Sequence, residues 1–446
     1  MLRLFGLPLV VPVIVAVFGI VAVYGRGGWL NAALGWAGFG AIAPIYGLTG
    51  ILIAHVFFNL PLAVRLLLDA WTAIPPESWR LANQLGLSSA QAFRFVEWPS
   101  LRQVLPGVAT IVFFLCFTSF GVVLTLGGGP RSTIIEVAIY QALRLDFDVP
   151  RAVVLALVQL ALCAVIGGVV LATRRTMATA AGSLLAGARP DAQALGGKIV
   201  DGVVILVAVT GVALPLAATV ARAAAGPWAS LAGDAELWRA ALWSVTIGLA
   251  AGALAVTLGF ALALGIRELR VRRRRPLLAG IVELLGSVTL VVSPLVLGAG
   301  LFVLALPVVG RPEVALGLVI VVDAMLTVPY AVRLLVPPMA RQAHAHDRLC
   351  ASLGIAGLDR FRLIDWPTLR RPAGLACALA AALAAGDLGA IALFGTGEVE
   401  TLALRLYRQI AGYRLDDAAV TAAALVCLAA ALFVVVERGV GGREHR

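Results

Sequence analysis

Long uninterrupted runs of apolar residues constrain the fold of this chain more than any other feature. A helix needs roughly 20 apolar residues to cross the hydrocarbon core of a bilayer. Charged residues make up 13% of the 446 positions, about half the share of a soluble protein. Because the runs do not alternate with polar residues, they exclude a membrane β-barrel. We predict an all-α polytopic membrane protein with about 10 transmembrane helices, near 4–24, 42–66, 104–126, 150–173, 199–222, 240–264, 279–306, 314–336, 373–395 and 418–437.

The basic residues indicate which loops face the cytoplasm. The net charge is +11. With the N-terminus inside, 25 of the 35 basic residues fall on the inner side or at its membrane borders, as the positive-inside rule requires. The run RELRVRRRR at 267–275 is the strongest anchor. We therefore expect a multi-pass membrane protein with both termini cytoplasmic and no nucleic-acid partner.

A 44-residue segment occurs twice in the chain. Residues 59–102 align with 327–370 without a gap at an offset of 268, and 16 of the 44 pairs are identical. An internal repeat of this length predicts two homologous halves in tandem. We assign 1–175 to the first half, 176–198 to a cytoplasmic linker rich in Ala and Gly, and 199–440 to the second half.

The first half is expected to lack two helices that open the second. At the same offset the span at 279–306 corresponds to 11–38, whereas the spans at 199–222 and 240–264 correspond to no residue of the chain. Either the two halves are asymmetric, or the chain begins late relative to an ancestor with twelve spans.

Each copy of the repeat contains a glycine followed 13 residues later by a proline. The two pairs are Gly86 with Pro99, and Gly354 with Pro367. The segments 77–93 and 345–361 have a helical composition with regularly placed apolar residues. A short amphipathic helix cannot bury its apolar face alone, so we expect these loops to dock into a groove of a partner protein.

These loops resemble the EAA loop of ABC importer permeases, whose pattern is EAA-x3-G-x9-I-x-L-P. The G, I, L and P positions are occupied by Gly86, Val96, Trp98 and Pro99, and again by Gly354, Ile364, Trp366 and Pro367. Arginine replaces the glutamate in both copies, which read Arg80-Leu81-Ala82 and Arg348-Leu349-Cys350. The resemblance covers essentially the whole chain, because permeases with two fused halves form a known subgroup.

The resemblance implies two tandem type I permease domains that work by alternating access. It implies an ABC ATPase dimer at the two loops and a periplasmic substrate-binding protein outside. The implied ATPase-docking residues are Arg80, Leu81, Ala82, Gly86, Pro99, Arg348, Leu349, Cys350, Gly354 and Pro367. Because the chain has no GxxxxGK[ST] phosphate-binding loop, ATP hydrolysis is assigned to the partner. We expect no enzymatic activity, catalytic residue, metal site or cofactor in the chain itself.

Two further stretches, 118–148 and 386–422, resemble the thiamine permeases of this class. That resemblance implies translocation of thiamine or thiamine phosphates. Ferric-iron permeases are the alternative, since they have related LG…LFG segments. A secondary transporter with internal repeats is a rival from another class, but it does not need paired cytoplasmic loops.

Duplicated glycines and intramembrane polar residues mark a candidate substrate path. Gly121 and Gly389 stand at the same repeat position, and glycine allows close helix contact or a break in a helix. An ionisable residue at membrane depth indicates function by default, so Asp323 and Asp387 are candidates to face a cationic substrate. Asp387 alternatively caps a broken helix, and His55 is interpreted as a packing group. The candidate path residues are Ser119, Phe120, Asp323, Asp387 and Phe394.

Overall fold

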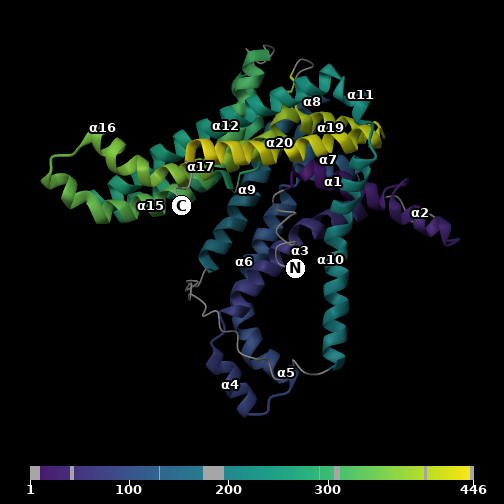
Figure 1. Cartoon of the computed structure of the whole chain (residues 1–446), viewed down its shortest axis with the longest axis horizontal. Coiled ribbons are helices and arrows are strands. Elements are labelled where there is room, and N and C mark those ends of the chain that lie inside the picture. Colours follow the sequence, from purple (N-terminus) through teal and green to yellow (C-terminus); the bar gives the residue numbers. More distant parts are fainter. Residues whose placement is uncertain are drawn as a thin grey trace. The chain divides into compact units, whose positions relative to one another are not determined.

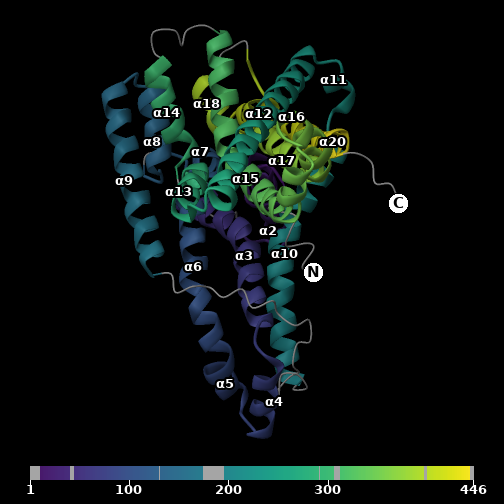
Figure 2. The ribbon, with the colours of Figure 1, turned by 90° about the vertical axis from the view of Figure 1, so that its left-hand side faces the viewer.

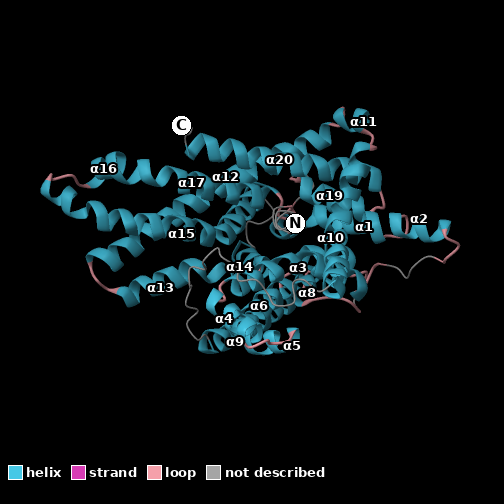
Figure 3. Ribbon diagram, turned by 60° about the horizontal axis from the view of Figure 1, so that its bottom comes forward, coloured by secondary structure: helices cyan, strands magenta, loops and turns pink. Residues whose placement is uncertain are grey.

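The computed structural model of the chain describes residues 11–40, 45–129, 131–173, 195–290, 292–305, 312–395 and 399–441. Within these ranges every regular element is a helix (Figure 3). The elements up to the middle of the chain are α1 (Val13–Tyr24), α2 (Trp29–Trp36), α3 (Leu48–Thr72), α4 (Pro76–Gln84), α5 (Ser89–Ala92), the π-helical turn η2 (Phe93–Glu97), α6 (Trp98–Phe117), α7 (Phe120–Leu126), α8 (Ile135–Arg144), α9 (Val149–Thr173) and α10 (Leu195–Ala224).

The remaining elements follow in the same order along the chain. They are α11 (Trp228–Ala232), α12 (Ala235–Arg267), the π-helical turn η3 (Glu268–Arg272), α13 (Pro276–Ser287), the 3-10 turn η4 (Val288–Leu290), α14 (Pro294–Ala305), α15 (Pro312–Ser352), α16 (Gly357–Arg360), the π-helical turn η5 (Phe361–Asp365), α17 (Trp366–Ala385), α18 (Gly389–Phe394), α19 (Leu402–Ala411) and α20 (Leu415–Gly441). The predicted all-α class is confirmed.

Eight helical segments of the described chain are long and apolar enough to cross a membrane. They are Val13–Trp36, Leu48–Thr72, Ser89–Phe117, Val149–Gly168, Gly197–Ala224, Ala235–Arg272, Glu313–Ala343 and Leu415–Gly441. The chain is thus a polytopic membrane protein, as predicted.

The other predicted spans consist of shorter pieces. The span expected at 279–306 is α13, η4 and α14, because Ser293 and Pro294 start a new helix there: Ser293 Oγ accepts the N–H of Leu295 at 3.2 Å, and proline favours the first helical turn. The span expected at 373–395 is the end of α17 followed by the short α18. The span expected at 104–126 overlaps the membrane-length segment Ser89–Phe117 and continues past its end into α7.

The described residues form two compact units. The first contains Gly19–Ser132 and Leu162–Thr219 in their described parts. Here α3 packs along α6 and α7, and Figure 2 shows α4 and α5 beyond the ends of α3 and α6. Gly19 on α1 approaches α10 so closely that a Cβ would lie 2.5 Å from the carbonyl oxygen of Pro215. Small residues permit this contact between helices.

The second unit contains Pro12–Phe18, Thr133–Ala161 and the described part of Val220–Arg446. Its centre is the packing of α12, α15, α17 and α20 (Figure 1). Small residues again set the helix spacing: a Cβ at Gly259 of α12 would lie 2.5 Å from the Cβ of Ala331 on α15. Side chains larger than hydrogen therefore cannot enter this contact without moving the helices.

These compact units do not coincide with the tandem halves expected at 1–175 and 199–440, since Thr133–Ala161 belongs to the second unit. The expected linker at 176–198 lies outside the described residues except for the start of α10 at Leu195. The tandem division stays a prediction. It is supported by helix boundaries, because α5, η2 and α6 occur again as α16, η5 and α17 with every boundary displaced by 268 residues.

Candidate functional site

Each copy of the loop turns at a glycine with a left-handed backbone. Gly86 has a φ of +61° and Gly354 a φ of +67°. In both loops the N–H of the residue after the glycine donates to the carbonyl five residues earlier, at 3.1 Å in the first copy and 2.9 Å in the second. This is the Schellman helix ending, which favours glycine. A Cβ at either position would meet no atom within 4 Å, so the backbone conformation, and not packing, requires the glycine.

Both loops expose apolar side chains at the same repeat positions. The exposed pairs are Leu81 with Leu349, Leu85 with Leu353, Phe95 with Leu363, and Trp98 with Trp366. The four leucines at 81, 85, 349 and 353 lie outside the eight membrane-length segments. A grouped apolar surface of this kind indicates contact with another protein.

The predicted docking residues divide into exposed and buried positions. The exposed ones are Arg80, Leu81, Gly86, Arg348, Leu349, Gly354 and Pro367, and Pro99 is half-buried. Ala82 and Cys350 are buried, with 1% and 2% of their surface exposed. They belong to the interior of their loops and are not available for direct contact with a partner.

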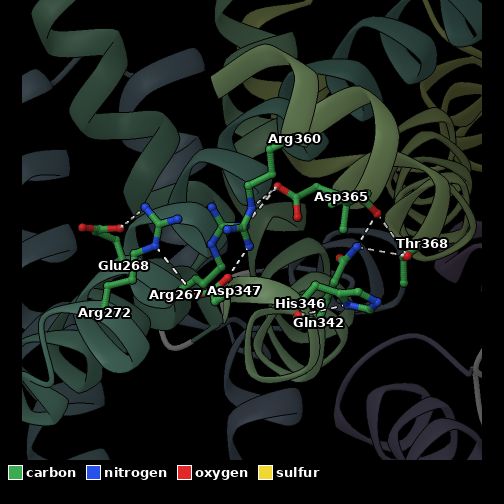
Figure 4. A network of polar contacts seen from close by, with 10 residues as sticks. Arg267, Glu268, Arg272, Gln342, His346, Asp347, Arg360, Asp365 and Thr368 are labelled. Carbon is green, nitrogen blue, oxygen red and sulfur yellow. Dashed lines mark hydrogen bonds and ion pairs between the residues drawn. The ribbon is translucent and has the colours of Figure 1, made fainter. Parts of the chain in front are cut away.

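A buried arginine holds the second loop together. Arg360 on α16 is 4% exposed. It donates to Asp347 Oδ1 on α15 at 2.5 Å and lies 3.5 Å from Asp365 Oδ2 on η5 (Figure 4). Arg267 at the end of α12 donates to the same Asp365 oxygen at 3.1 Å. Burial lowers the pKa of the Arg360 guanidinium, but the Asp347 and Asp365 carboxylates outweigh burial and raise that pKa overall. Arg360 therefore stays charged.

A glutamine extends this network to the start of α17. Gln342 Nε2 donates to the carbonyl of Ile364 and, at 3.1 Å, to Thr368 Oγ1. His346 lies one turn further along α15, with Nδ1 3.3 Å from the Gln342 carbonyl. Together these contacts fix the second loop to α12 and α15 (Figure 4).

The first loop fills the equivalent positions with apolar groups. Trp79 stands where the second copy has Asp347, and Ala92 stands where it has Arg360. Both are buried, at 2% and 0% exposure, and the Trp79 ring lies 5.6 Å from that of Trp71. The same loop interior is thus built from an ion pair in one copy and from apolar side chains in the other.

A second group of predicted residues lies at the breaks between long and short helices. In the first unit, His55 Nε2 on α3 lies 2.8 Å from Oγ of Ser119, between α6 and α7. The Ser119 hydroxyl donates to the Cys116 carbonyl at 2.7 Å, so it accepts the hydrogen bond from His55. This hydrogen bond links α3 to the break between α6 and α7, and a link of this kind is called a tie below.

In the second unit two carboxyl groups make the corresponding tie. Asp323 on α15 and Asp387, between α17 and α18, are joined by a hydrogen bond between their side chains. Asp387 Oδ2 also accepts the N–H of Ala390 at 2.8 Å, which caps α18. The structure therefore brings together two residues that the sequence singled out separately.

The two ties occupy the same positions of the repeat. His55 and Asp323 are 268 residues apart, and so are Ser119 and Asp387. The geometry is conserved between the copies of the repeat within this chain, while the chemistry changes from imidazole and hydroxyl to two carboxyls.

The two predicted aromatic path residues lie in packed surroundings. Phe120 is 4% exposed and Phe394 is 3% exposed. The Phe394 ring lies 6.1 Å from that of Phe302 on α14. Their role in a substrate path stays a prediction.

Known proteins resemble the chain over nearly its whole length. The thiamine transport system permease protein ThiP of Escherichia coli (strain K12) is 44% identical over 440 residues, which are 98% of this chain and 81% of that protein. ThiP of Brucella abortus (strain 2308) is 43% identical over 444 residues, 100% of this chain and 81% of that protein. ThiP of Haemophilus influenzae is 38% identical over 440 residues, 98% of this chain and 81% of that protein.

The chain belongs to the ThiP permease family. It is thus an ABC importer permease. The sulfate transport system permease protein CysW of a Synechocystis strain is 31% identical over 101 residues, 23% of this chain and 36% of that protein. No family model matches the chain.

Sequence reasoning missed two features of this ThiP-family chain. The pairing of His55 with Ser119 was not predicted, although extending the repeat alignment by four residues places His55 opposite Asp323. The Arg360 network was not predicted, since Arg267 and Asp365 are separated by 98 positions in the sequence and only helix packing brings them together. The repeat alignment did contain a sign of this network, because Asp347 and Arg360 occupy the positions at which the first copy has Trp79 and Ala92.

Proposed function

We propose that this chain is the transmembrane permease of a binding-protein-dependent importer that translocates thiamine or thiamine phosphates across the bacterial inner membrane. The observation that carries the proposal is the identity of 38–44% with ThiP permeases over at least 98% of the chain.

The two duplicated loops form the dock for a separate ABC ATPase dimer. Their exposed leucines supply apolar contact area in both copies, and their positive-φ glycines fix the turn that presents it. Arg80 and Arg348 are exposed at the positions where the family pattern has glutamate, so the contact surface on the ATPase is expected to be acidic there. ATP-driven closure of the partner would move the loops and alternate access to the substrate path.

Orientation follows from charge. The arginine-rich loops lie on the cytoplasmic side under the positive-inside rule, and both termini then face the cytoplasm. A periplasmic substrate-binding protein delivers the substrate on the opposite side.

The test is uptake by the complete importer. The chain is reconstituted in proteoliposomes with a cognate ABC ATPase and periplasmic binding protein, and uptake of radiolabelled thiamine is measured with and without ATP. We expect ATP-dependent thiamine accumulation that requires the binding protein. Accumulation of ferric ion in place of thiamine, or thiamine uptake driven by an ion gradient without ATP, would overturn the proposal.

A further inference from the structure

The Asp323–Asp387 tie consists of two acids, whereas its counterpart consists of an imidazole and a hydroxyl group. A hydrogen bond between two carboxyl groups needs at least one proton, since two carboxylates can only accept. Asp387 also accepts backbone N–H groups at the start of α18, which suits the carboxylate form. With the proton on Asp323 and the carboxylate on Asp387, the pair as a whole bears one negative charge.

No positive group balances this charge among the described residues. Neither carboxyl forms an ion pair with an arginine or lysine of the described residues, and Asp387 is held by the backbone at the start of α18. Moreover, Asp323 is 2% exposed and its Oδ1 has no hydrogen-bond partner in the described structure. A buried acceptor of this kind is costly unless something binds it.

The position of the pair makes the charge more costly still. Asp323 lies ten residues into the membrane-length segment that begins at Glu313, which is about 15 Å along the helix axis at ~1.5 Å per residue. That places it near the middle of a hydrocarbon core about 30 Å thick. Ionisable residues at this depth are rare and mark ion or substrate pathways.

A purely structural role does not explain the carboxyls. His55 and Ser119 join the same two elements in the first copy at 2.8 Å with neutral groups. A tie between the long helix and the helix break therefore needs no acid. The second copy retains two acids where a neutral pair forms the same contact.

We infer that Asp323 and Asp387 form a cation-selecting site on the translocation path, which takes an organic cation of the thiazolium class. This inference rests on the proposed function, since thiamine carries a permanent positive charge on its thiazolium ring. The carboxylate of Asp387 attracts the cation, and the free Oδ1 of Asp323 accepts from it or from its polar substituents. The His55–Ser119 pair supplies the tie on its side without competing for the cation.

The decisive variant introduces the residues of the His55–Ser119 pair at the equivalent positions of the second copy. Asp323→His with Asp387→Ser keeps a hydrogen-bonded tie but removes the negative charge. The complete importer is reconstituted in proteoliposomes, and two quantities are measured: thiamine uptake, and ATP hydrolysis stimulated by the thiamine-loaded binding protein. We expect uptake to fall at least tenfold while stimulated hydrolysis stays within about twofold of wild type. The control Asp146→Asn changes an exposed acid that pairs with Arg151 and should leave both quantities unchanged.

The possible results distinguish failure of the cation site from failure of the proposed function. Unchanged thiamine uptake in the transplanted variant would overturn the cation site, and so would a parallel loss of uptake and stimulated hydrolysis, which indicates a structural tie. If the transplanted protein does not assemble, the double variant Asp323→Asn/Asp387→Asn is measured by the same criteria. A wild-type importer that does not take up thiamine at all would instead defeat the proposed function.

Discussion

Arg360 and Asp347 form a 2.5 Å ion pair inside the second loop, where the first loop has Ala92 and Trp79. The interior of the loop is thus packed with an ion pair in the second copy and with apolar side chains in the first. An ion pair with a side chain as buried as Arg360 is costly to break, because the remaining partner keeps its charge without compensation. An apolar pair of suitable volume can replace it at little cost.

Replacement of Arg360 by alanine should loosen the second loop. The variant leaves Asp347 without its closest cation, and we expect destabilisation of about 3 kcal/mol. Trypsin cleavage within 341–362 should then become faster in the purified protein. The double variant Asp347→Trp/Arg360→Ala installs the residues of the first loop and should recover most of the protection. Equal cleavage of the single and double variants would contradict the equivalence of the two interiors.

The positive-φ glycines should be required for coupling and not for insertion. Valine at Gly86 and Gly354 introduces about 1–2 kcal/mol of strain at each site. We expect the double variant to insert normally but to lose most ATP-driven uptake. Asparagine at both sites should retain most uptake, because it tolerates the left-handed conformation.

The matched control for this experiment is Gly107→Ala. Gly107 lies on α6 without a positive φ, and a Cβ there would also meet no atom within 4 Å. Full uptake by the Gly86→Val/Gly354→Val protein would show that the turn is not part of the coupling mechanism.

The exposed leucines should determine the affinity for the ATPase. Burial of a half-exposed leucine stabilises a complex by about 1–2 kcal/mol. Leu81→Ser combined with Leu349→Ser should therefore weaken ATPase binding at least about tenfold, measured by titrating the ATPase onto the permease in nanodiscs. Leu145→Ser, at a leucine 63% exposed outside the loops, is the control. Wild-type affinity in the double variant would place the dock elsewhere.

Gly259 should limit the approach of α12 and α15. Valine there places a methyl group against Ala331, whose Cβ would be 2.5 Å from the new Cβ. Overpacking of this kind costs about 1–3 kcal/mol, and the unfolding midpoint should fall by about 1–3 °C. Gly265→Val on the same helix is the control, because a Cβ at Gly265 meets no atom within 4 Å. Similar midpoints for both variants would mean that α12 shifts to admit the side chain.

The sequence predicted features that depend on composition and on the repeat, and missed those that depend on packing. The apolar runs predicted the membrane helices, and the 268-residue offset predicted two equivalent loops. The break at Ser293 was not predicted, since an apolar run does not reveal where a side-chain cap starts a new helix. Asp323 and Asp387 were each predicted, but their hydrogen bond was not. It depends on how α15 lies against the end of α17, which composition does not determine.

The π-helical turns have a mechanical consequence. Because η2 and η5 continue the helix, α5 to α6 form one rod over Ser89–Phe117, a segment of 29 residues, and α16 to α17 form its counterpart. Each rod is about 43 Å long. It starts in a docking loop and ends two residues before Ser119 or Asp387. For a rod that tilts as one body, a tilt of about 10° at the loop carries the far end through about 7 Å. In each copy the duplicated loop and the polar pair are therefore the two ends of one continuous helical segment.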